Sequence, residues 1–255
     1  MVFSKKKSGI FLLLLLGLSS LTGFSASQAH PEKDAELLPS WVATIGFGPF
    51  WEHGGKTQTF FLTPEIEKTY AATGAEPTLV GGEFFLGIQK TLGEKLQGQL
   101  GLAVATTSDA RLLGNIWDDA DPEFNNFNYN YRINHTHLAL KTKLLADIAF
   151  VVRPWISGSI GVGFNHAHGF DNRPIIFEAL KNPNFSSKTK TDFTYTVGIG
   201  VQRALREHWQ VGLGYEFADW GKSQLGRAHG QTLGHGLSLN HLYTNGLLLN
   251  LTYVA

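Results

Sequence analysis

The chain has 255 residues, with 21 Lys and Arg against 21 Asp and Glu, and it contains no cysteine. The lack of cysteine excludes a disulfide scaffold, a zinc–thiolate site and a cysteine nucleophile. The balanced charge and the absence of a basic stripe exclude a nucleic-acid partner. No segment after residue 29 approaches the roughly 18 consecutive apolar residues of a membrane-spanning helix.

The first 29 residues have the features of a secretory signal peptide. Lys5, Lys6 and Lys7 precede an apolar core over residues 10–18, and Ser27-Gln28-Ala29 supplies small residues for cleavage. A retained anchor is the alternative, which the shortness of the apolar run disfavours. Cleavage leaves 18 Lys and Arg against 21 Asp and Glu, a formal charge of −3. We expect residues 30–39 to be an N-terminal periplasmic segment and residues 40–255 to form one domain.

In chain order, the domain shows a repeated two-residue period, which is typical of strands with two different faces. In the first segment Trp41, Ala43, Ile45 and Phe47 alternate with small or polar residues. Eight such segments are about ten residues long, as a tilted strand needs to cross a bilayer. They cover residues 41–50, 80–90, 96–105, 131–144, 154–164, 193–201, 209–217 and a final strand from about 237 to 254.

The links between these segments alternate strictly in length. Short links lie at residues 92–95, around 147 and at 205–208, and long links lie at 53–78, 106–130, 165–190 and 218–236. This alternation predicts an all-β, eight-stranded antiparallel up-and-down transmembrane barrel with short periplasmic turns and long extracellular loops. A soluble barrel of the lipocalin kind is the alternative, but its apolar face would line the interior.

Parity assigns the side chains to the two faces of the barrel. We expect Trp41, Trp209, Tyr215 and Tyr253 to form a lipid-facing girdle. We expect a polar network inside the lumen, formed by Glu83, His135, His137, Lys141, Glu216, Gln97 and Gln99. Charges in so narrow a space must pair, so the sequence predicts a hydrogen-bonded plug with at most a small conductance. A narrow pore for small solutes is the alternative.

The signal peptide, the eight alternating strands, the glycine-rich inner faces and the terminal Leu-Thr-Tyr-Val resemble the opacity-protein/OmpA-like eight-stranded outer-membrane barrels. The resemblance covers about residues 40–255. It implies a monomer in the outer membrane of a Gram-negative-type bacterium, in contact with outer-membrane lipid and the outer-membrane assembly machinery. Such proteins usually end on an aromatic residue, whereas this chain ends on Ala255, two residues after Tyr253.

Several small barrels of this kind modify lipid acyl chains, so the histidines are candidates for chemistry. His135 with His137, and His166 with His168, have the spacing that puts two side chains on one strand face. A third metal ligand at a fixed spacing is missing. His241 is followed two residues later by Tyr243, where lipid A deacylases have a serine nucleophile. We therefore expect no enzyme activity, catalytic residue, cofactor or metal, with a lipid A-modifying enzyme as an alternative.

The long links are where binding is expected. We expect a structural or adhesive surface protein that contacts host or cell-surface ligands through these links. The stretch from Thr63 to Tyr70 is compatible with a short helix. Asn245-Gly246 is normally a hairpin signal, but a hairpin there would give nine strands, so we expect these two residues to lie within the last strand or to form a bulge in it.

Overall fold

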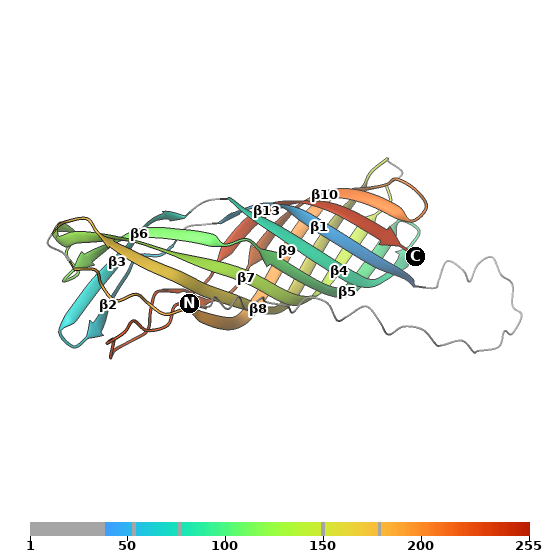
Figure 1. Ribbon diagram of the computed structural model, residues 1–255. Coiled ribbons are helices and arrows are strands. Elements are labelled where there is room, and N and C mark those ends of the chain that lie inside the picture. Colours follow the sequence, from blue (N-terminus) through green and yellow to red (C-terminus); the bar gives the residue numbers. More distant parts are fainter. Residues whose placement is uncertain (1–38, 53–54, 76–77, 149–150, 178–179) are drawn as a thin grey trace, which may run out of the picture. The chain divides into compact units, whose positions relative to one another are not determined.

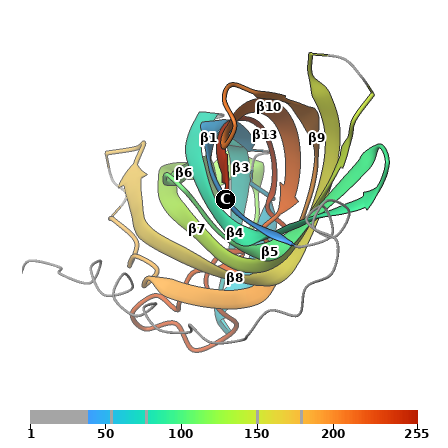
Figure 2. The same ribbon diagram turned by 90° about the vertical axis from the view of Figure 1, so that its right-hand side faces the viewer.

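Eight antiparallel strands close into a ring in the computed structural model (Figures 1 and 2). The structure describes residues 39–52, 55–75, 78–148, 151–177 and 180–255. The predicted signal peptide and nearly all of the predicted segment 30–39 lie outside these residues. The order around the ring is β1 (Ser40–Glu52), β4 (Thr78–Gly93), β5 (Leu96–Thr107), β7 (Asn125–Ala146), β8 (Arg153–Pro174), β9 (Lys188–Ala204), β10 (Trp209–Asp219) and β13 (Tyr243–Val254).

The ring closes where the last strand meets the first. Ala43 is opposite Tyr253 and Phe47 is opposite Leu249, while β13 also pairs with β10 along its length. The eight-stranded barrel fold is therefore confirmed. β13 runs unbroken through Asn245 and Gly246, because Trp51 is opposite Asn245 and Phe50 is opposite Gly246. The prediction that these residues lie inside the last strand is correct.

Two of the predicted long loops consist mostly of strand. Beyond β1 the chain forms β2 (Gln58–Thr63) and β3 (Ile66–Ala75), and beyond β5 it forms β6 (Ala110–Asp118). These strands continue the wall past the barrel, since β7 pairs with β5 near the short turns and with β6 farther out (Figure 1). The predicted helix at residues 63–70 is wrong, because Thr63 pairs with Ile66 across the β2–β3 turn. A 3₁₀ turn, η2 (Pro122–Phe124), precedes β7.

The link between β10 and β13 folds back inside the extended wall. It contains β11 (Ser223–Gln224) and β12 (Ser238–Leu239), which pair with each other. The last strand consequently begins at Tyr243, and the expected start near residue 237 is wrong. Residues 237–242 leave the barrel wall because Leu237, Leu239 and Leu242 are buried in the interior of the extension. Among the described residues, no helix is long and apolar enough to cross a membrane.

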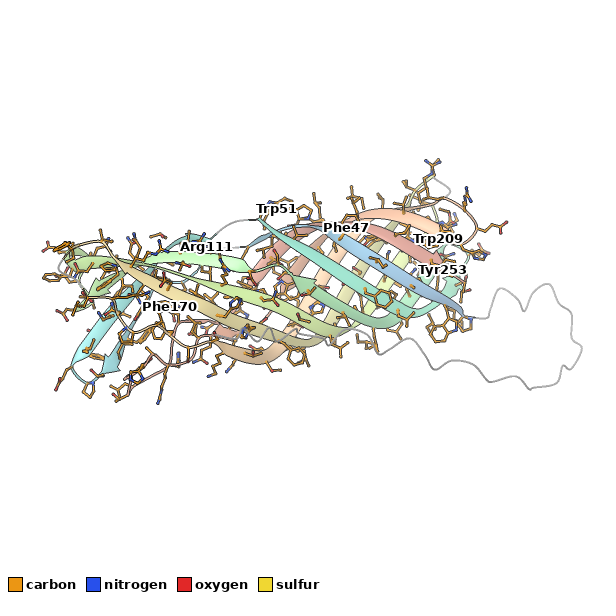
Figure 3. The ribbon with its side chains drawn as sticks, viewed as in Figure 1. Phe47, Trp51, Arg111, Phe170, Trp209 and Tyr253 are labelled. Carbon is orange, nitrogen blue, oxygen red and sulfur yellow. The ribbon has the colours of Figure 1, made fainter. Side chains whose placement is uncertain are left out.

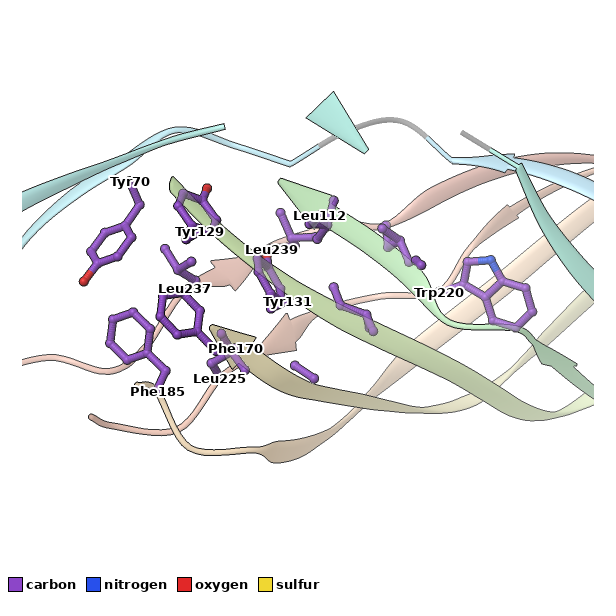
Figure 4. Packing of buried hydrophobic residues seen from close by; sticks show 14 of the residues in the cluster. Tyr70, Leu112, Tyr129, Tyr131, Phe170, Phe185, Trp220, Leu225, Leu237 and Leu239 are labelled. Carbon is purple, nitrogen blue, oxygen red and sulfur yellow. The ribbon is translucent and has the colours of Figure 1, made fainter. Parts of the chain in front are cut away.

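An aromatic cluster fills the interior of the extension (Figure 4). Tyr129 stacks on Phe170 with ring centroids 5.8 Å apart, and Phe170 meets Phe185 edge-on at 4.8 Å. Tyr70 lies 5.3 Å from the Phe60 ring. Burial raises the pKa of Tyr70 and of Tyr129. The extension is thus a packed structure with its own apolar core.

Candidate functional site: the closed lumen and the outer surface

The outer face of the barrel is an apolar belt. On β7 the exposed side chains Leu138 and Leu140 alternate with buried Ala139 and Lys141, and every ring strand shows the same inversion. Large exposed aliphatic and aromatic side chains on all ring strands would be a severe liability in water. A bilayer gives this surface an apolar environment, and closure of the ring leaves no unpaired strand edge within it.

The aromatic residues expected in a girdle all lie on this outer face. Trp41 is 61% exposed, and Trp209 contacts Tyr253 edge-on with centroids 5.2 Å apart. Trp209 and Tyr253 lie together at the end of the barrel that carries the C-terminus (Figure 3). Tyr215 lies farther along β10, where its hydroxyl donates to Asn245 Oδ1 at 2.7 Å. Trp51, which parity did not single out, is exposed at the opposite end of β1.

The centre of the lumen contains a buried ion cluster. Lys141 Nζ donates to both carboxylate oxygens of Glu83 at 2.6 and 2.8 Å, and to Glu216 Oε2 at 2.8 Å. The three residues come from β7, β4 and β10, so the cluster crosses the barrel. All three are buried. Unpaired charges there would be very costly, and this arrangement gives each carboxylate a cation.

A second polar layer lies beside the ion cluster. Lys143 Nζ donates to Gln202 Oε1 at 2.5 Å and lies 4.5 Å from the centroid of the Trp155 ring. Gln202 in turn donates to Gln210. Gln99 is buried and donates to Gln89 at 2.8 Å, whereas Gln97 is half-buried on the same face of β5. The Trp155 ring lies over Gly200 and Gly214, a contact between strands that parity alone could not predict.

Little free space remains among these side chains. A cavity of about 20 Å³ is lined by residues that include Glu83, Gln99, Lys141, Lys143 and Trp155. Its volume corresponds to roughly one water molecule. The described lumen is therefore blocked by side chains at this level.

Trp220 closes the lumen on the side of the extension. It is 2% exposed, and its ring lies 5.7 Å from that of His135 and 4.9 Å from that of His137. Its indole N–H donates to Thr244 Oγ1 at 2.8 Å. Asn165 binds His135 Nδ1 at 2.7 Å and donates to the Trp220 carbonyl at 2.6 Å. His135 and His137 are thus packed beneath the incoming link, which sequence parity alone could not show.

Three other described histidines, His166, His168 and His241, were also candidates for chemistry. His166 and His168 stack with centroids 5.0 Å apart, away from His135 and His137. His241 Nδ1 lies 2.9 Å from Asp219 Oδ2, as in a base held by a carboxylate. Tyr243 stacks on the His241 ring at 5.4 Å with planes 2° apart, which keeps its hydroxyl out of the imidazole plane. Ser238 bonds Gln58 instead, so the described residues give this pair no serine nucleophile.

No group of three possible metal ligands occurs within the described ranges.

The sequence reasoning also missed a polar contact at the far end of the extension. There Lys68 binds Asp118, whose second oxygen accepts from Asn126 at 2.8 Å. This contact joins β3, β6 and β7 and secures the outer part of the wall.

A closed ring of eight antiparallel strands, an apolar exterior, aromatic rims and a polar interior define an outer-membrane type of β-barrel. Comparison with family models gave no match, and a search of curated proteins gave no significant match. Among solved structures, the chain is similar to Neisserial surface protein A, with 9% identity, a TM-score of 0.42 and coverage of 84% of this chain and 96% of that one.

Two other solved barrels give comparable values. The outer-membrane protease OmpT from Escherichia coli has 11% identity and a TM-score of 0.44, with coverage of 85% of this chain and 97% of that one. OprG from Pseudomonas aeruginosa has 13% identity and a TM-score of 0.42, with coverage of 86% and 97%.

Proposed function

We propose that this protein is a non-conducting, non-catalytic surface barrel of a Gram-negative-type outer membrane, and that it binds ligands through its extracellular extension. The supporting observation is the combination of a blocked lumen with an outward wall that has its own packed apolar core. The short turns and both ends of the described chain would face the periplasm, as in other bacterial barrels. β2, β3, β6 and the outer halves of β7 and β8 would then project from the cell.

The tip of the extension has the composition of a contact surface. Phe177 is 100% exposed and Leu180 is 89% exposed, directly after the end of β8. Phe124, Ile175 and Ile176 are also exposed there, and Ile175 is joined to the start of β7 by a hydrogen bond from its N–H to the Asn126 carbonyl. Exposed apolar residues on a stable wall are typical of protein–protein contact sites.

Charged groups surround this tip. Asp171 accepts hydrogen bonds from Lys181 at 2.5 Å and Arg173 at 3.3 Å. The hydrogen bond from Lys181 is the main reason that the pKa of Asp171 is lowered. An apolar tip with a polar rim matches the general organisation of a protein interface. These features support an adhesive contact formed by Phe124, Ile175, Ile176, Phe177 and Leu180.

An adhesion assay with tip variants tests this proposal. Cells that express Phe177→Ala/Leu180→Ala should adhere less to the target surface than cells with the natural chain, because the exposed apolar contact is removed. The matched control is Leu205→Ala, which removes an exposed leucine at the opposite, short-turn end. Unchanged adhesion of the tip variant, at equal surface expression, would contradict the proposed role of the tip.

A permeability measurement on the same cells separates this function from a pore. Deletion of the gene should reduce adhesion and leave the uptake of small solutes unchanged. Reduced uptake with intact adhesion would favour the narrow pore instead. A lipid A profile with and without the protein tests the enzymatic alternative, for which we expect an unchanged acylation pattern.

A further inference from the structure

The link between β10 and β13 is anchored in the lumen by a small polar network. The side-chain nitrogen of Asn165 donates to the carbonyl oxygens of Trp220 and Lys222, at 2.6 and 2.8 Å. Since both bonds use the amide N–H groups, the Asn165 side-chain oxygen accepts the third bond, from His135 Nδ1 at 2.7 Å. The network therefore places a proton on Nδ1 of His135, and in the neutral ring Nε2 is a bare acceptor.

The pair of His135 and His137 has no partner for an added proton. His135 Nε2 and both ring nitrogens of His137 are buried and form no hydrogen bond with the described residues. Protonation of either ring would create a buried N–H donor without an acceptor and a buried positive charge, and both are costly. The two rings contact Trp220. Attraction between a cation and the indole offsets only part of the cost of desolvating a charge.

The surrounding charges do not favour a second cation in this layer. The titratable groups that face the histidine pair or the foot of the link are Glu83, Glu216, Lys141, Asp192, Asp219 and His241. Lys141 already binds both glutamates, and its charge repels one on His137. Asp192 and Asp219 accept backbone N–H groups of the link, and His241 contacts Asp219. Among these groups, no carboxylate is left to pair with a protonated His135.

Trp220 ties the first residues of the link to the barrel. Its backbone N–H donates to the Leu242 carbonyl at 2.9 Å, and the Leu242 N–H donates to the Gly221 carbonyl at 3.2 Å. Its indole donates to Thr244 on β13. Because these bonds meet around one side chain, displacement of Trp220 would break several of them together. Residues 221–225 would then lose their fixed position against β8 and β9, which Lys222 contacts.

We propose that His135 and His137 form a proton-sensitive latch for the link between β10 and β13. The latch is closed while both rings are neutral, and mild acid opens it, because a charged imidazole is stable only where water reaches it. Opening moves Trp220 away from the pair and frees residues 221–225. The ion cluster of Lys141 stays in place, so opening loosens the base of the extension without forming a pore. The inference is independent of the adhesive tip.

Hydrogen–deuterium exchange of the full-length protein in lipid vesicles tests the latch. Exchange of residues 220–225 is compared at about pH 7.5 and about pH 5, after correction for the intrinsic pH dependence of amide exchange. In the natural chain these amides should exchange at least about tenfold faster in acid, because exposed imidazoles, with an ordinary pKa of about 6.5, take up protons there. His135→Gln/His137→Gln keeps neutral polar side chains and should be equally protected at both pH values. His166→Gln/His168→Gln removes the stacked outer pair and, as the matched control, should keep the full acid response.

Two results would overturn the proposal. One is equal protection of residues 220–225 in the natural chain at both pH values. The other is a full acid response in His135→Gln/His137→Gln, which would assign the response to carboxylates such as Asp219. Where the double variant lacks protection even near neutral pH, the single variants decide. Each keeps one titrating ring and should respond less to acid than the natural chain, and a full response in both would contradict the latch. Heat-modifiable gel migration shows that each variant is folded.

Discussion

At the scale of single residues, the charges in the lumen decide how the barrel interior is closed. Strand parity was enough to place Glu83, Lys141 and Glu216 on the inner face, because the side-chain period of a strand is two. Parity gives no information on which residues meet across the barrel, since that depends on the relative heights of β4, β7 and β10. The structure adds that one lysine serves both carboxylates.

Replacement of Lys141 by methionine should therefore be strongly destabilising. It leaves Glu83 and Glu216 buried without a cation, at a cost of about 3–5 kcal/mol. The loss should appear as a lower urea midpoint for unfolding from lipid vesicles, followed by heat-modifiable gel migration. The exposed Lys90→Met should change the free energy of unfolding by less than about 0.5 kcal/mol.

A triple variant checks the electrostatic origin of this loss. In Lys141→Met/Glu83→Gln/Glu216→Gln no ionised group remains in the cluster, so part of the stability should return. If the single Lys141→Met variant were as stable as the natural chain, the ion cluster would not hold the lumen closed.

At the scale of elements, glycine-lined strands allow large side chains to cross the narrow interior. The Trp155 ring lies where Cβ atoms of Gly200 and Gly214 would be, at 2.5 and 2.4 Å respectively. A Cβ at Gly200 would also meet the Leu213 carbonyl oxygen at 2.3 Å, which the backbone cannot easily relieve. The glycine-rich inner faces are therefore shaped to one aromatic side chain.

Gly200→Ala should consequently strain the β9–β10 wall and destabilise the barrel by about 1–3 kcal/mol. Urea unfolding from vesicles measures this change. Gly74→Ala is the matched control, because an added Cβ there meets nothing within 4 Å. Equal stability of the two variants would show that both Trp155 and the β9–β10 backbone can make room for the added Cβ, which would contradict the close fit of this glycine face.

The length of the strands was the element-scale property that sequence patterning underestimated. Above the belt the outward residues become polar, as at Asn128, Asn130 and Arg132, so the alternation continues with the apolar and polar faces exchanged. The inner residues Phe127, Tyr129 and Tyr131 are buried in a core made by distant segments. The apolar outward positions therefore identified the membrane-spanning parts of the strands. The continuation of the wall as β2, β3 and β6 lacks this feature and was not predicted.

The link between β10 and β13 depends on Trp220 for its position. Trp220→Ala should destabilise the protein by about 3–5 kcal/mol, because it removes a fully buried aromatic ring. It should also make residues 223–236 accessible to protease in the folded barrel. Phe124→Ala, at an exposed site, should leave the digestion pattern of this link unchanged. Resistance of the link in the Trp220 variant would mean that the other contacts of β11 and β12 suffice to hold it.

At the scale of the whole molecule, the chain consists of a membrane barrel with an apolar outside and polar inside, continued by a wall with an apolar inside. The reversal occurs where Trp220 separates the histidine pair from the aromatic cluster. The sequence predicted the barrel half well, because lipid imposes a strict alternation. It could not predict the aromatic core of the extension, since that core depends on contacts between β3, β7, β8 and the last long link.

The closed state of the lumen is the property on which the proposed function depends most directly. Single-channel recording of the full-length protein in a planar lipid bilayer measures it. The ion cluster, the Lys143–Gln202–Gln210 layer and Trp220 together predict no stable conductance for the natural chain. Large, steady conductance steps from folded, heat-modifiable protein would contradict the closed lumen and favour a pore.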